Sequence, residues 1–105
     1  MYHVLLHGFL ASIIVRLIME EEFVFKPSAF KHGIVEEDIL CAFKRRVFDY
    51  AMPGEENKNL LLGISRDGSL LEIVYNVLEN DIINVFHAMK CRKSYHFLIR
   101  TRGTK

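Results

Sequence analysis

Hydrophobic and polar residues are unevenly distributed along the chain, and the first eighteen residues differ from the rest. Residues 1–18 contain no acidic side chain, and Arg16 is their one side chain that is always charged at neutral pH. Their apolar residues recur in pairs every four positions. That spacing predicts an amphipathic helix. The segment is too short and too interrupted for a stable membrane span, which needs about 20 apolar residues. It also lacks the basic start and the cleavage site of a secretory signal.

Two interpretations of this leader, residues 1–18, stay open. In the first, it is an amphipathic helix that docks on the domain, on a second copy of the chain or on a membrane surface. In the second, it is upstream sequence read in frame, and the natural start is Met19. In both cases we expect residues 19–105 to form a single domain, because this length suits one hydrophobic core.

The first half of this domain mixes a strand with helices. Residues 22–26 alternate polar and apolar side chains, which predicts a short strand that ends before Pro27. Residues 27–32 predict a helical turn with Gly33 as its left-handed C-cap. The clearest helix covers residues 36–46, because its first turn is acidic and its last turn is basic, as the helix dipole favours. Its predicted buried stripe is Ile39, Leu40, Phe43 and Val47.

The second half predicts a sheet. An exposed loop, residues 53–58, precedes an apolar strand at 59–65. A tight turn at 66–68 joins it to a strand at 69–78, and a further turn leads to a strand at 82–88. We expect the basic tail that follows to form a closing helix. The predicted fold is α+β: a small antiparallel sheet, made of a three-stranded meander plus the N-terminal strand, with helices packed on one face.

Composition narrows the function classes. The chain has 14 Lys+Arg and 13 Asp+Glu residues, so its formal charge of +1 gives no general attraction to nucleic acid. Basic residues nevertheless gather at 44–46 and 90–105, and acidic ones at 20–22 and 36–38. Such an uneven distribution of charge favours RNA binding on the basic side of the molecule. The two cysteines have no metal-ligand spacing and the five histidines are scattered, so we expect a cytoplasmic protein with reduced thiols and no metal.

An ordered set of motifs resembles one family. The run Lys31-His32-Gly33-Ile34-Val35-Glu36-Glu37-Asp38-Ile39, followed by Ala42-Phe43, resembles the opening of the BrnT family. These are small ribonuclease toxins of bacterial type II toxin–antitoxin pairs, with a RelE-like fold. Gly63 and the run from Gly68 to Ile73 are similar to the family's glycine-bounded hairpin. The stretch from Ile83 to Arg92, with Tyr95, is similar to its final strand and basic helix.

The resemblance covers residues 19–95 and implies a function. It implies a metal-independent endoribonuclease that cleaves RNA by 2′-OH attack, without a cofactor, and that is neutralised by a cognate antitoxin protein. One position departs from the family, which usually has an arginine after the small residue that ends the last strand. Here that residue is Met89, after Ala88. The departure favours an alternative, a non-catalytic RNA- or protein-binding module of the same fold. A third alternative is a structural homodimer whose interface is the leader.

The candidate catalytic residues lie mostly at the end of the last strand. RNA cleavage of this kind needs groups that move two protons and groups that stabilise the charge on the phosphate. A cluster within nine residues supplies both kinds: His87, Lys90, Arg92 and Tyr95. His32, in the motif that resembles the family's opening, is a further candidate. The candidate RNA-binding residues are Lys44, Arg45, Arg46, Arg66 and Lys93.

Each candidate also has a purely structural interpretation. Strict alternation puts His87 on the same side of its strand as Ile83 and Val85, which favours a packed histidine. A histidine before a C-cap glycine often caps its own turn, a tyrosine after a strand often lies at the core edge, and basic runs are often solvated. Glu72 lies in mid-strand on the polar side. It is either a base on an open sheet surface or, as we expect, an ordinary exposed residue.

Overall fold

The computed structural model describes the backbone of residues 21–103 and the side chains of residues 21–99. The predicted leader, residues 1–18, lies outside the described residues. The elements are β1 (Glu22–Phe25), the 3-10 turn η2 (Pro27–Phe30), α2 (Glu36–Lys44), β2 (Arg46–Ala51), β3 (Asn59–Ile64), β4 (Leu70–Val77), the 3-10 turn η3 (Glu79–Asp81), β5 (Ile82–Lys90), the 3-10 turn η4 (Lys93–Tyr95) and α3 (His96–Gly103).

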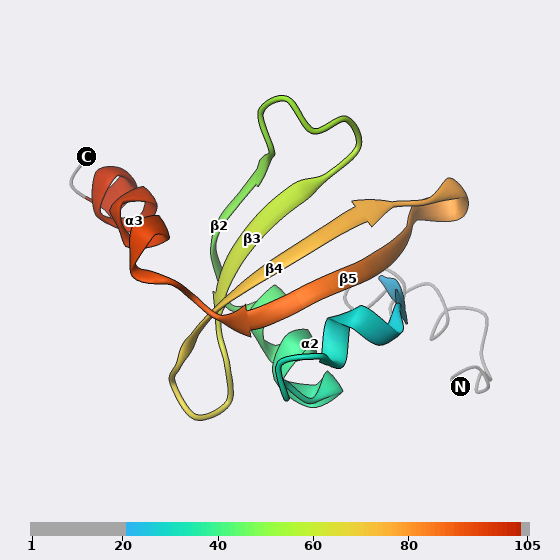
Figure 1. Cartoon of the computed structure of the whole chain (residues 1–105), viewed down its shortest axis with the longest axis horizontal. Coiled ribbons are helices and arrows are strands. Elements are labelled where there is room, and N and C mark those ends of the chain that lie inside the picture. The colour runs from blue at the N-terminus through green and yellow to red at the C-terminus, as the bar shows by residue number, and fades with distance from the viewer. Residues whose placement is uncertain (1–20, 104–105) are drawn as a thin grey trace, which may run out of the picture.

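The strands form one mixed sheet in the order β1-β5-β4-β3-β2 (Figure 1). β1 lies parallel to β5, and every other neighbouring pair is antiparallel. The predicted α+β class is therefore confirmed. The turns predicted at Gly33 and Gly68 are also present. The two residues have φ of 83° and 89°, values that favour glycine over every other residue.

One strand was not predicted. The expected helix at residues 36–46 ends at Lys44, because Arg45 leaves the helical conformation with φ −110° and ψ 44°. The chain then enters β2 directly, and β2 forms an edge of the sheet beside β3. Val47, expected in the buried stripe of the helix, lies in β2 with 40% of its surface exposed. That part of the prediction is wrong.

The core lies between α2 and one face of the sheet. Ile39 and Phe43 of α2 pack over Leu61 and Ile73, which are partners in the β3–β4 register. α2 approaches this face so closely that a Cβ atom added at Gly63 would overlap the backbone carbonyl of Ala42. The glycine is therefore what allows α2 to rest on β3.

The C-terminal elements differ from the predicted closing helix. β5 continues to Lys90, and α3 begins at His96 after η4. α2 packs on one sheet face as expected, whereas α3 contacts β2 and lies apart from α2 (Figure 1). Within residues 21–103, neither helix is long and apolar enough to cross a membrane.

A bulge in β5 decides which face its last residues occupy. Val74 pairs with His87 but Tyr75 pairs with Val85, which leaves Phe86 as an extra residue in β5. Val85 and Tyr75 belong to the core under α2. The extra residue shifts the alternation, so His87 points to the opposite face. The expectation that His87 shares a side with Ile83 and Val85 is wrong for this reason.

Candidate functional site

The sheet face opposite α2 carries two cross-strand rows of side chains, which together we call the site face. The first row runs across β2, β3, β4 and β5 and contains Phe48, Leu62, Glu72 and Met89. The second row runs across the same strands and contains Tyr50, Leu60, Val74 and His87. His87, a catalytic candidate on β5, is therefore continuous with residues on the sheet edge that the sequence analysis did not single out.

Glu72 is the centre of the polar contacts on this face. Its side chain is 1% exposed, so the expectation of an ordinary exposed residue is wrong. The backbone N–H and Nε of Arg92 both donate to Oε1, at 3.0 Å each. Oε2 accepts from Nη2 of Arg92 at 2.6 Å and lies 3.0 Å from Nε2 of His87. Each group that these contacts bring to the carboxylate is able to donate a hydrogen bond to it.

These contacts keep Glu72 ionised. Burial disfavours the charged form, but the hydrogen bonds from Arg92 and His87 outweigh it and hold the pKa of Glu72 below its usual value of 4.5. The carboxylate correspondingly raises the pKa of Arg92, mainly by accepting its hydrogen bonds. A buried negative charge therefore lies next to the His87 ring at neutral pH.

His32 lies beside His87, although 55 residues separate them in sequence. Their ring centroids are 5.5 Å apart and the ring planes cross at 75°. The two rings meet because β1 is short. It pairs only with Ile82–Val85, so η2 packs along the β5 edge beyond Val85. η2 is attached there because the Ser28 hydroxyl donates to the Phe86 carbonyl at 2.7 Å. The turn after η2 then presents His32 to His87.

Arg92 and Tyr95 also meet at the site. The Arg92 guanidinium lies over the Tyr95 ring, with Cζ 5.1 Å from the ring centroid. A helix beginning near Lys90 was expected to place these two residues on one face. No helix begins there, but η4 has the same effect, because the Tyr95 backbone N–H donates to the Arg92 carbonyl at 3.0 Å. Lys90 does not join this group: it pairs with Leu71, whose side chain faces α2.

Two of the RNA-binding candidates are engaged on the other side of the sheet. Arg46 forms an ion pair with Asp49 at 2.7 Å and lies near Glu21 at 4.0 Å. Arg45 donates to the carbonyl of Ser65 at 3.2 Å. These arginines therefore hold β2 and the 66–68 turn against the end of α2.

The remaining RNA-binding candidates are spread over the surface. Arg66 lies 2.8 Å from Asp38, and this contact lowers the pKa of the Asp38 carboxyl chiefly through the hydrogen bond. Lys44 is exposed at the end of α2, and Lys93 is exposed in η4. The expected separation of basic from acidic patches is incomplete, because Arg46 of the 44–46 patch lies 4.0 Å from Glu21 of the 20–22 patch.

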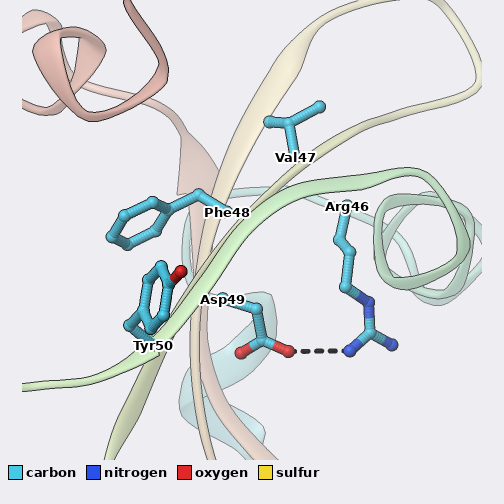
Figure 2. Close-up of a pocket in the computed structure, with 5 residues that line it drawn as sticks. All are labelled: Arg46, Val47, Phe48, Asp49 and Tyr50. Carbon is cyan, nitrogen blue, oxygen red and sulfur yellow. Dashed lines mark hydrogen bonds and ion pairs between the residues drawn. The ribbon is translucent and has the colours of Figure 1, made fainter. Parts of the chain in front are cut away.

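The structure also brings a cation to the site face that the sequence analysis missed. Lys58 immediately precedes β3, and its Nζ lies 5.6 Å from the ring centroid of Phe86, the neighbour of His87. By composition, Lys58 belonged to an exposed loop, and no motif marked it. A hollow of about 250 Å³ lies along β2 and is lined by residues 46–50 (Figure 2).

No protein-family model matches the chain, and neither a curated protein nor a solved structure was found that matches it. Among the residues that the structure describes, no group of three His, Cys, Asp or Glu side chains is arranged to hold a metal ion. What the site face does assemble is a set of acid–base groups: two imidazoles, an ionised carboxylate and a tyrosine, with the guanidinium of Arg92 directed at the carboxylate.

Proposed function

We propose that this chain is a metal-independent endoribonuclease that cleaves RNA through attack of a ribose 2′-OH on the adjacent phosphate. The observation that carries the proposal is the contact between the His87 and His32 rings, with Glu72 behind His87. Two imidazoles at one point supply both proton transfers that the reaction needs. The proposal extends to the toxin role, the RelE-like fold and the antitoxin partner that the resemblance to the BrnT family implies.

His87 acts as the general base. The ionised Glu72 accepts a hydrogen bond from the Nε2–H of His87, so the single proton of the neutral ring stays on Nε2 and Nδ1 carries none. Nδ1 removes the proton of the 2′-OH while the 2′ oxygen forms a bond to phosphorus. Glu72 then faces the imidazolium that results, and this stabilises the charge that develops on the base.

His32 acts as the general acid. Its protonated ring gives a proton to the 5′ oxygen as the bond between that oxygen and phosphorus breaks. The products are one fragment ending in a 2′,3′-cyclic phosphate and one beginning with a 5′-OH. Arg92 serves chiefly as a support for Glu72, because its donors are directed at the carboxylate. The Tyr95 ring packs against the Arg92 guanidinium.

The proposal is tested by inducible expression of the full chain. We expect growth arrest and RNA fragmentation with the parent chain, and neither with His32→Ala or His87→Ala. Glu79→Ala, which removes an exposed charge in η3, is the control and is expected to act like the parent. A folded parent that leaves growth and RNA intact would contradict the proposal.

A non-catalytic RNA-binding module is the second candidate, and one observation favours it. Met89 lies on the site face where the family usually has an arginine, and the guanidinium of Arg92 is directed at Glu72. Neither residue then presents a cation to a phosphate at the centre of this face. The two candidates differ in one readout: the module retains RNA binding by the purified chain but releases no fragments.

A further inference from the structure

The bulge in β5 directs two consecutive carbonyl groups toward the same edge of the strand. The Val85 carbonyl accepts from the backbone N–H of Lys26 at 2.8 Å, and the Phe86 carbonyl accepts from the Ser28 hydroxyl at 2.7 Å. Consecutive carbonyls of a regular strand point to opposite edges, so the extra residue Phe86 is what presents both to the segment after β1. The bulge that turns His87 to the site face therefore also creates the acceptor for Ser28.

A side chain makes the second of these bonds because the backbone no longer follows the strand. Pro27 has no N–H group and begins η2, so strand-like pairing with β5 stops after Lys26. Ser28 is the second residue of η2, and its hydroxyl reaches across to β5. Through this bond, η2 is attached to β5 one residue before His87.

The attachment at Ser28 determines the place of His32. The Ser28 carbonyl accepts from the backbone N–H of Lys31 at 3.3 Å, which ties the residue before His32 to η2. Ala29, completely buried, holds η2 to the core. One attachment point leaves rotation about it, whereas Ala29 and Ser28 together fix the direction of the turn. His32 is exposed, so its place beside His87 depends on where this turn lies.

We propose that Ser28 is a positioning residue of the nuclease, whose bond to the Phe86 carbonyl holds the general acid His32 against His87. Ser28 transfers no proton itself, because its hydroxyl proton is directed at the carbonyl. This inference rests on the proposed function, which assigns His32 as the acid. The single bulge then places both groups, the base directly and the acid through Ser28. Since Ser28 is exposed, water replaces its hydroxyl at the carbonyl in a Ser28→Ala chain, which stays folded.

The first measurement is independent of cleavage. In the full chain, labelled at histidine, the nuclear Overhauser effect between the ring protons of His32 and His87 reports their contact. We expect Ser28→Ala to lose this signal and Ser28→Thr, which keeps the hydroxyl, to retain it. The matched control is Ser69→Ala, which removes another serine hydroxyl, one hydrogen-bonded to Asp67 in the turn between β3 and β4. It is expected to retain the signal.

The second measurement separates the acid from the base. With RNA as substrate, Ser28→Ala is expected to lower kcat about tenfold and to leave KM unchanged, because a misplaced acid slows the chemistry without altering a contact to RNA. The second substrate is a nucleoside 3′-(4-nitrophenyl phosphate), whose leaving group departs without protonation. On it, Ser28→Ala and His32→Ala are expected to match the parent, whereas His87→Ala is expected to lose activity on both substrates.

The results distinguish the inference from the proposed function. A signal between the two rings that persists in Ser28→Ala would overturn the inference. Equal losses of activity on the two substrates would also overturn it, because they would indicate a general structural defect. A parent that cleaves neither substrate would contradict the proposed function alone, and a ring signal lost in Ser28→Ala and retained in Ser28→Thr would still support the positioning of His32 by Ser28.

Discussion

Replacing Glu72 by glutamine tests the centre of the site directly. The two side chains have nearly the same shape, but the carboxylate accepts from donors on both of its oxygens, from Arg92 on one and from Arg92 and His87 on the other. An amide has one acceptor oxygen, so its NH₂ group must face groups that also donate. His87 is able to accept from that NH₂ only by moving its own proton to Nδ1, which is the tautomer that cannot act as a base there.

The magnitude follows from the burial of the carboxylate. Breaking a buried ion pair costs about 3–5 kcal/mol, because the remaining charge has no partner. The Arg92 side chain is 50% exposed, so water solvates part of the guanidinium when its partner is lost. We therefore expect Glu72→Gln to lower the free energy of unfolding by about 3 kcal/mol.

Urea denaturation followed by circular dichroism measures this loss. With a slope near 2 kcal/mol per M, the midpoint is expected to fall by about 1.5 M while the slope itself stays constant. Glu79→Gln, at an exposed position in η3, is the control and is expected to change stability by less than about 0.5 kcal/mol. A Glu72→Gln midpoint equal to that of Glu79→Gln would refute the assignment of Glu72 as a buried, ionised partner of Arg92.

Further predictions concern pH, packing and thiol reactivity. The pKa of Glu72 is lower in the folded chain than its usual 4.5. The stabilising contribution of Glu72 is therefore complete above pH 4.5 and is lost as the pH falls through the folded pKa. The urea midpoints of the parent and Glu72→Gln should then converge in acid, and a constant difference between them would contradict this. Gly63→Ala should cost about 3 kcal/mol in the same assay, because its Cβ overlaps the Ala42 carbonyl, and a loss below about 1 kcal/mol would be inconsistent with that packing. Burial and then the Glu72 charge raise the pKa of Cys91 to about 11, so in a Cys41→Ser background iodoacetamide should modify it at pH 8 on the order of 100-fold more slowly than a free thiol.

Local signals in the sequence were sufficient for most of the fold. Pro27, Gly33 and Gly68 mark turns through their own backbone preferences, and the structure has turns at each of them. β2 was missed because residues 44–47 contain no glycine or proline, and Val47 continues the helical spacing of Ile39 and Phe43. Nothing local shows that Arg45 leaves the helix. Its conformation accompanies contacts with Ser65 and with the sheet.

The candidate site could be predicted only in part from the sequence. His87, Arg92 and Tyr95 were grouped because they lie close together in the chain, whereas His32 was added through the family resemblance. The bulge at Phe86 reverses the side of His87, and a bulge has no reliable pattern of its own. The burial of Glu72 depends on Arg92, a partner 20 residues away, and periodicity does not encode such a contact.

The central claim is that the His87–His32 pair cleaves RNA through the 2′-OH. The most direct measurement incubates the purified full chain with an RNA oligonucleotide in the presence of EDTA and identifies the fragment ends by mass spectrometry. The account predicts fragments ending in 2′,3′-cyclic phosphate and a rate that falls by about 10²–10⁴-fold in His87→Ala. Cleavage of an oligonucleotide of the same sequence with 2′-O-methyl groups, which lacks the attacking 2′-OH, or an unchanged rate in a folded His87→Ala chain, would contradict it.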